Sequence, residues 1–227
     1  MLNLSAISNA TMQEIPYKWI VFENLLDTSV QSELANSFPT TNYKEYHARD
    51  FEPDGYPEYT YNDYRFFARC ILDESKYKGL QDIKDLSLSW QKLIEQLLTP
   101  DYREAMEHLT NLDLKNHSLT IYLTRHDLGF WNRPHTDIPR KHVTQLFYLN
   151  EGWNPEWGGC FRVLKDNQTT SVVKEVPPLP QYSVAIVRCD RSWHMVSPIS
   201  LNATQHRLHL ATGATRFGEV GSKTSDR

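Results

Sequence analysis

Helical patterns fill the first half of this chain and short strand patterns fill the second, and this order constrains the fold more than any other feature. Two amphipathic helices are expected over 85–98 and 100–109, with Thr99 as the N-cap of the second and Pro100 in its first turn. Stripes of this kind indicate helices that pack one face against a core. The stripe of the first helix repeats at helical spacing through Leu86, Trp90, Leu93 and Leu97.

Beyond Leu112 the pattern changes to short apolar runs separated by Gly, Pro, Asn and Asp, which is typical of strands. Helices followed by many short strands predict an α+β fold whose second half is a sandwich or barrel, braced on one face by the helices. The strand candidates are 119–124, 143–149, 160–164, 183–188, 194–196 and 207–212.

The N-terminal part contains two shorter elements and a long aromatic segment. Residues 19–22 predict a buried strand, and Asp27 is expected to cap a helix that ends before Pro39. Between Tyr43 and Phe67 aromatic residues are mixed with Pro and Gly, which suits neither a regular helix nor a clean strand. We therefore expect a long ordered loop with an aromatic lining there.

Composition and charge exclude several classes of protein. With 227 residues, 40% of them hydrophobic and 23% charged, the chain is expected to form a single globular domain over 1–227. A net charge of -4 argues against nucleic-acid binding through a broad basic face, and no apolar run is long enough to span a membrane. The 3 cysteines are an odd number at spacings that suit neither a disulfide framework nor a zinc site made of cysteines alone, so a cytoplasmic location is expected.

One histidine and one aspartate are spaced as a pair of metal ligands. His135 and Asp137 are two residues apart, so on an extended segment both side chains project to the same side. His194 is the best candidate for a third ligand, because it follows a strand candidate and a tight stretch that can return the chain alongside the pair. Two histidines and a carboxylate form the facial triad of non-haem Fe(II) oxygenases. The same ligands also suit zinc, so they leave both metals open.

Arg207 begins an alternating stretch that places a positive charge inside the predicted barrel. Arg207, His209 and Ala211 share one face, and Leu208 and Leu210 share the other. If the leucines pack against the helices, the guanidinium lies inside, where an unpaired charge is costly. An anionic ligand is therefore expected, and a dicarboxylate that chelates the metal at one end and pairs with Arg207 at the other meets the need.

These motifs, taken in order, resemble those of a known family. The ordered set is far more specific than any single member. It runs His135-Thr136-Asp137, Tyr148-Leu149-Asn150, Trp153, Gly158-Gly159, Trp193-His194-Met195-Val196, Pro198 and Arg207. Over about residues 118–212 the chain resembles the 2-oxoglutarate/Fe(II)-dependent dioxygenases of the prolyl 4-hydroxylase-like group.

The resemblance implies a fold and a set of cofactors. The core over about 113–215 is expected to be a double-stranded β-helix, or jelly roll, preceded by a helical part over about 12–112 and followed by a loose C-terminal tail. The implied cofactors are Fe(II), 2-oxoglutarate as cosubstrate and O2, with ascorbate as an optional reductant. The family pattern places iron on His135, Asp137 and His194, and the distal carboxylate of 2-oxoglutarate on Arg207. Tyr122 matches the family's upstream tyrosine, which also contacts the cosubstrate.

The implied activity is hydroxylation of an unactivated C–H bond, with release of succinate and CO2. The small size of the chain favours a small molecule or free amino acid as substrate, and the family pattern leaves a peptidyl, prolyl-type substrate as the alternative. Two rival classes are a metal-dependent jelly-roll enzyme with non-oxidative chemistry and a ligand-binding jelly roll. The residues expected around the substrate are Tyr56, Tyr59, Arg133, Tyr148 and Arg162.

Overall fold

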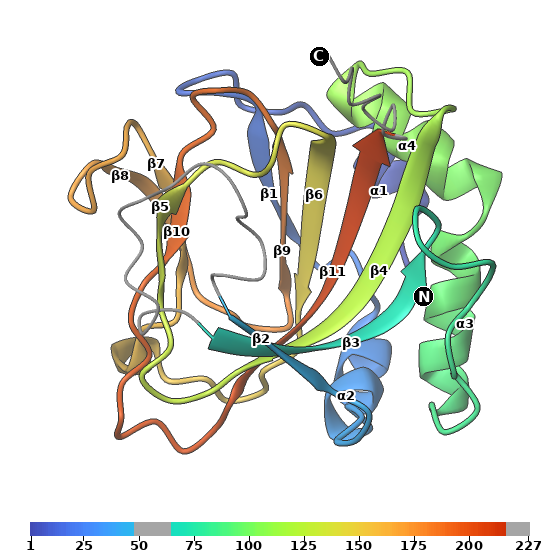
Figure 1. Ribbon diagram of the computed structural model, residues 1–227, viewed down its shortest axis with the longest axis horizontal. Helices are drawn as coiled ribbons and strands as arrows, with labels where there is room; N and C mark the ends of the chain where they lie inside the picture. Colours follow the sequence, from blue (N-terminus) through green and yellow to red (C-terminus); the bar gives the residue numbers. More distant parts are fainter. Residues whose placement is uncertain (48–64, 217–227) are drawn as a thin grey trace, which may run out of the picture.

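A computed structural model describes residues 1–47 and 65–216 of the chain (Figure 1). The helices of this part are α1 (Leu4–Ser8), α2 (Thr28–Asn36), α3 (Leu88–Leu97), α4 (Pro100–Thr110) and the short 3-10 helix η2 (Pro155–Trp157). The strands are β1 (Trp19–Glu23), β2 (Lys44–His47), β3 (Arg65–Asp73), β4 (His117–His126), β5 (Asn132–His135), β6 (Lys141–Tyr148), β7 (Phe161–Leu164), β8 (Val172–Val176), β9 (Tyr182–Val187), β10 (His194–Val196) and β11 (Arg207–Arg216).

The strands form two antiparallel sheets. The larger sheet has the order β1-β9-β6-β11-β4-β3-β2, and the smaller has the order β5-β10-β7-β8. Figure 1 shows α1, α3 and α4 beside one face of the larger sheet, with the smaller sheet on its other side. This arrangement of two antiparallel sheets confirms the expected α+β jelly roll with bracing helices.

Two apolar clusters hold the layers together. One lies between the helices and the larger sheet, where Trp90 and Leu93 of α3 pack with Ile121, Leu123 and Leu210 of the sheet. Burying each such side chain stabilises the fold by about 2 kcal/mol. The other lies between the sheets and contains Phe161, Val163, Val184 and Ile186. Successive residues of a strand face opposite sides of the sheet, so only every second side chain of the larger sheet points into the space between the sheets.

The two main helices begin where a hydroxyl caps the backbone. The α4 prediction is confirmed, and Thr99 Oγ1 accepts the amide hydrogen of Tyr102 at 3.3 Å. Helix α3 begins at Leu88, later than the expected residue 85, because Ser87 is its N-cap and accepts from the amide of Trp90. Asp85 instead accepts two hydrogen bonds from Arg69 of β3, at 2.9 and 2.5 Å.

The cap predicted for α2 is only partly correct. Asp27 stands at the N-cap position, but its side chain makes no cap hydrogen bond. It pairs instead with the N-terminal ammonium of Met1. The helix ends at Asn36, before Pro39, as expected.

The strand candidates of the second half are all present, as β4, β6, β7, β9, β10 and β11.

The ordered loop expected from Tyr43 to Phe67 is wrong at both ends. β2 and β3 form an antiparallel pair in which Tyr46 faces Phe66. The rings of these two residues stack at 5.4 Å. The central part of that loop, residues 48–64, lies outside the described residues.

Besides β2, the strands β3, β5 and β8 were not expected, and each of these three lacks clean alternation. β3 is buried over most of its length on both faces, β5 is half-buried throughout, and β8 is exposed except at its last residue. Their strand geometry comes from pairing with neighbours, which local periodicity does not report. Among the described residues, no helix is both long and apolar enough to cross a bilayer.

Candidate metal centre

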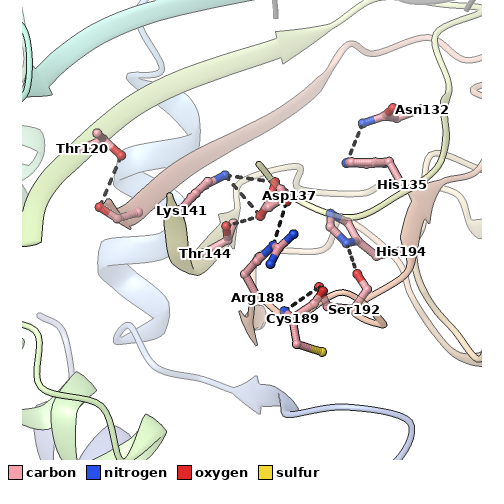
Figure 2. Close-up of polar contacts among 11 residues, drawn as sticks. Thr120, Asn132, His135, Asp137, Lys141, Thr144, Arg188, Cys189, Ser192 and His194 are labelled. Atoms are coloured by element: carbon pink, nitrogen blue, oxygen red, sulfur yellow. Dashed lines mark hydrogen bonds and ion pairs between the residues drawn. The ribbon is translucent and has the colours of Figure 1, made fainter. Parts of the chain in front are cut away.

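Two strands of the smaller sheet bring the predicted ligands together. β5 ends at His135, β10 begins at His194, and these two residues are direct partners in the antiparallel register. Asp137 follows β5 by two residues. The ligand atoms of His135, Asp137 and His194 all lie within 4.8 Å of one another, and Figure 2 shows the three side chains converging. Such a spacing suits one metal ion bound by all three.

Backbone carbonyls orient both imidazoles. Nδ1 of His135 lies 2.7 Å from the carbonyl oxygen of Arg133, and Nδ1 of His194 lies 2.9 Å from that of Ser192. A carbonyl only accepts, so each Nδ1 donates its hydrogen and each Nε2 carries the lone pair that can bind a metal. Nε2 of His135 accepts a long hydrogen bond from Asn132 Nδ2 at 3.4 Å (Figure 2). The Ser192 hydroxyl in turn donates to the carbonyl of Cys189 at 2.7 Å, which fixes the turn that carries His194 (Figure 2).

The Asp137 carboxylate is held by neighbours on β6. The Thr144 hydroxyl donates to Oδ2 at 2.6 Å, and the Lys141 ammonium lies 3.4 Å from the same oxygen. Burial opposes the charged form, but Lys141 and the two histidines hold the pKa of Asp137 well below its usual range. Asp137 is therefore ionised and ready to bind a cation.

The histidine ligands are held in the uncharged form. Burial and the neighbouring His135 lower the pKa of His194 to about 3. Burial likewise lowers the pKa of His135. A neutral imidazole is the form that binds a metal, so the donor set fits Fe(II) without having to lose protons at neutral pH.

Arg207 is fully buried on the inner face of β11, as expected from the alternating pattern. Its Nε donates to the carbonyl of Gly159 at 2.7 Å, and its Nη1 lies 3.1 Å from Nδ1 of both His126 and His209. Within the described residues, Nη2 of Arg207 and the hydroxyl of Tyr148 are buried without a hydrogen-bond partner. The guanidinium carbon lies 5.1 Å from the centre of the Tyr148 ring.

These two buried donors without a partner suit an anion. A buried cation and a buried hydroxyl with unused hydrogens are costly unless a ligand accepts them. The distal carboxylate of 2-oxoglutarate fits this requirement, since it offers acceptor lone pairs and one negative charge. Arg207 and Tyr148 supply the donors.

The register of the larger sheet relates these two donors to the metal ligands. Thr144, which holds Asp137, and Tyr148, which lies against Arg207, are four residues apart on β6, or about 13 Å. Leu146 lies between them on the same face and pairs with Ala211 of β11. Thr144, Leu146 and Tyr148 therefore line one face of β6, which runs from the Asp137 carboxylate toward Arg207.

Of the other predicted residues, Tyr148 lies against the Arg207 guanidinium. Tyr122 faces inward beside Ala211, but its hydroxyl donates to Asp73 at 2.8 Å. The Tyr122 hydrogen is thus used within the protein, and Tyr148 is the better tyrosine for the carboxylate. Local sequence does not distinguish the two, because both stand at inward positions of predicted strands.

The remaining substrate candidates divide into three cases. Arg162 pairs with Glu175 and stands opposite Met195 in the register, so it lies on the face of the sheet away from His194, and the structure does not bring it to the site. The Arg133 guanidinium lies over the Trp131 ring at 5.4 Å, close in sequence to the ligands. Tyr56 and Tyr59 lie outside the described residues.

Sequence reasoning missed Thr144 and His126. Thr144 is four residues before Tyr148 on the same strand face, a spacing that identifies a shared face but not a contact with Asp137. His126 reaches Arg207 only because β4 pairs with β11, and that pairing has no local signal.

The fold and the donor sets of the site fit the non-haem iron enzymes that use a dicarboxylate cosubstrate. Residues 118–212 match the family model described as the 2OG-Fe(II) oxygenase superfamily. That match implies Fe(II) and 2-oxoglutarate as cofactors, and the donor sets above fit both.

Solved structures share the fold at low sequence identity. A prolyl-4-hydroxylase from Pseudomonas putida is 19% identical, with 87% of this chain and 92% of that chain covered and a TM-score of 0.58. A prolyl hydroxylase from Trichoplax adhaerens, in complex with a hypoxia inducible factor oxygen degradation domain peptide fragment, is 19% identical, covers 87% and 83%, and has a TM-score of 0.55. An oxidoreductase of the 2OG-Fe(II) oxygenase family from Burkholderia pseudomallei is 13% identical, covers 94% and 91%, and has a TM-score of 0.56. No curated protein sequence matches the chain.

Proposed function

We propose that this enzyme hydroxylates an unactivated C–H bond of a small molecule or free amino acid, with 2-oxoglutarate as cosubstrate. One observation carries the proposal: the ligand triad of the smaller sheet and the orphaned donors of Arg207 and Tyr148 on the larger sheet face the same space between the two sheets. A metal-dependent enzyme without a dicarboxylate cosubstrate has no use for the second feature, which argues against the non-oxidative and ligand-binding alternatives.

In the proposed site each residue has a defined task. His135, Asp137 and His194 hold Fe(II) on one side and leave its other positions open. Arg207 and Tyr148 bind the distal carboxylate of 2-oxoglutarate and so orient it toward the metal. When bound, iron and 2-oxoglutarate supply the oxidising power for the C–H bond, with O2 consumed and succinate and CO2 released. The buried walls exclude water from the reacting centre.

A peptidyl substrate is the second candidate, and the shared fold favours it. Two of the solved structures with this fold are named prolyl hydroxylases, and one of them is in complex with a peptide fragment. A panel of free amino acids and proline-containing peptides therefore belongs in any substrate screen. We further propose a cytoplasmic location, supported by three free cysteines, Cys70, Cys160 and Cys189.

The proposal is tested with Fe(II) and 2-oxoglutarate under anaerobic conditions. We expect a weak visible charge-transfer band when both are added, and succinate once air is admitted in the presence of a substrate from the panel. Asp137→Ala is expected to lose both signals, because it removes a ligand and leaves the donors of Arg207 and Tyr148 intact. No band and no succinate across the panel would refute the assignment.

Replacement of Arg207 separates the dioxygenase from its rivals. Arg207→Met keeps much of the side-chain volume and removes the charge, so the 2-oxoglutarate concentration for half-saturation is expected to rise at least about tenfold. Binding of Fe(II) is expected to be unchanged, since Arg207 does not contact the triad. An unchanged 2-oxoglutarate requirement would mean that the anchor is elsewhere.

A further inference from the structure

The Arg207 guanidinium is held by two imidazoles and not by an acid. Its Nη1 lies 3.1 Å from Nδ1 of His126 and 3.1 Å from Nδ1 of His209. A guanidinium nitrogen only donates, so both Nδ1 atoms must accept. An accepting Nδ1 requires a neutral ring whose hydrogen is on Nε2. The contacts therefore define both the charge and the tautomer of the two histidines.

The two rings are fixed by the sheet and by packing. Arg207 and His209 are two residues apart on β11 and share a face, while His126 of β4 is the direct register partner of Arg207. His126 and His209 are 7% and 5% exposed. Phe130 stacks on the His126 ring with 3.8 Å between ring centres. The rings are thus held where they are, independently of a ligand.

These contacts leave only one end of the guanidinium for a ligand. Nε is used by the Gly159 carbonyl, and the two hydrogens of Nη1 are matched by the two imidazoles. A guanidinium has five N–H donors, so the two on Nη2 remain. Nη2 and the Tyr148 hydroxyl are both buried and are among the side-chain atoms without a hydrogen-bond partner in the described part of the chain. A carboxylate must therefore bind between these two groups.

We propose that His126 and His209 are positioning residues for the cosubstrate, neutral acceptors that orient Arg207 so that Nη2 and the Tyr148 hydroxyl receive the distal carboxylate of 2-oxoglutarate. This inference rests on the proposed function and deepens it. An Asp or Glu at either place would neutralise Arg207 and compete with the cosubstrate. Two neutral imidazoles orient the guanidinium and leave its charge for the ligand.

Burial keeps the rings neutral in the range where the enzyme would work. Burial and the adjacent Arg207 lower the pKa of both His126 and His209 well below the ordinary histidine value. Lys141 acts on His209 in the same direction. Protonation of either ring would remove an acceptor and place a second cation beside Arg207.

The tautomers are measured on the protein without metal, by NMR of ¹⁵N-labelled imidazoles at neutral pH. We expect both His126 and His209 to carry hydrogen on Nε2 and none on Nδ1. His126→Asn and His209→Asn assign the two signals by their disappearance. Hydrogen on Nδ1 of either ring, or a charged ring, would overturn the proposal without bearing on the dioxygenase assignment.

The positioning role is measured by calorimetric titration of 2-oxoglutarate into anaerobic Fe(II)-loaded protein. His126→Leu and His209→Leu remove the acceptor and are each expected to weaken binding about tenfold, with Fe(II) affinity unchanged. His126→Asn and His209→Asn, whose Oδ1 stands near the place of Nδ1, are expected to restore binding to within about threefold of wild type.

The outcomes separate this inference from the proposed function. Wild-type protein that binds no 2-oxoglutarate would overturn both. Tight binding by the wild type and equally tight binding by the leucine variants would overturn only the role of the histidines. Asparagine variants that bind 2-oxoglutarate as weakly as the leucine variants would show that the size of the side chain and not its hydrogen-bond acceptor determines binding. That result would also overturn the role of the histidines.

Discussion

Three residues outside the sequence motifs hold Asp137 in place. Thr144 donates to Oδ2 at 2.6 Å, Lys141 lies within ion-pair distance, and Arg188 Nε donates to the Asp137 backbone carbonyl at 3.1 Å (Figure 2). A ligand oxygen that is already hydrogen-bonded has a fixed direction and loses less freedom when a metal binds. At the residue scale, metal affinity therefore depends on β6 as well as on the three ligands.

Thr144→Val tests this dependence, because valine keeps the shape and removes the hydroxyl. We expect Fe(II) binding to weaken by about tenfold, the lower end for loss of a group that orients a metal ligand. Anaerobic titration of Fe(II) measures the effect, and Thr144→Ser, which retains the donor, serves as the matched control. Equal affinities for Thr144→Val and the wild type would show that the contact with Asp137 does not orient it.

The segment between η2 and β7 shows how one element positions another. Gly158 has φ +68°, and a Cβ built on it would lie 2.1 Å from the carbonyl oxygen of Pro198. The next residue, Gly159, supplies the carbonyl that accepts from Arg207 Nε. The close approach of this segment to the chain after β10 therefore sets one of the contacts that hold the Arg207 guanidinium.

Gly158→Ala is expected to lower the free energy of unfolding by about 3 kcal/mol or more, because the methyl group strikes backbone that cannot move away cheaply. Urea denaturation measures it. Gly79→Ala is the matched control, since Gly79 has φ +76° with nothing within 4 Å of its built Cβ. The free energy of unfolding of Gly79→Ala should fall only by the cost of placing alanine at a positive φ, about 1 kcal/mol. Similar losses for both variants would contradict the steric explanation.

On the scale of the whole molecule, the jelly roll separates apolar from polar interior. The cluster beneath the helices is apolar, whereas the space between the sheets holds the metal ligands and the buried Arg207, His126 and His209. Stability is then coupled to pH through the imidazoles. A histidine with a folded-state pKa below its unfolded value favours folding above the unfolded pKa, and this contribution is lost as pH falls below it.

The free energy of unfolding of the metal-free protein is accordingly expected to fall as pH drops below the ordinary histidine pKa of 6.5. His126 and His209 each contribute about 1 kcal/mol of this loss over the first pH unit below that value, because these histidines bind protons in the unfolded chain and not in the folded protein. Urea denaturation at a series of pH values measures the slope. The double variant His126→Asn, His209→Asn should show a shallower slope, and an unchanged slope would contradict the assignment to these rings.

Much of the architecture was predictable because it depends on local pattern. The α4 boundary followed from Thr99 and Pro100, and the inward direction of Arg207 followed from the leucines on either side. The β2 and β3 pair was missed, since aromatic residues on a strand buried on both faces do not alternate. The predicted range of helix α3 was too long, because the Asp85 carboxylate accepts a hydrogen bond from Arg69 of β3 and Asp85 is not part of the helix.

By itself, the sequence determined the order of helices and strands, the spacing of His135 and Asp137, and the face on which Arg207 lies. These are consequences of backbone periodicity, which acts over a few residues. Tertiary structure alone decided that Tyr148 and not Tyr122 offers a free hydroxyl, and that His126 meets Arg207. Such contacts depend on strand register and packing between residues far apart in the chain, and no local pattern encodes them.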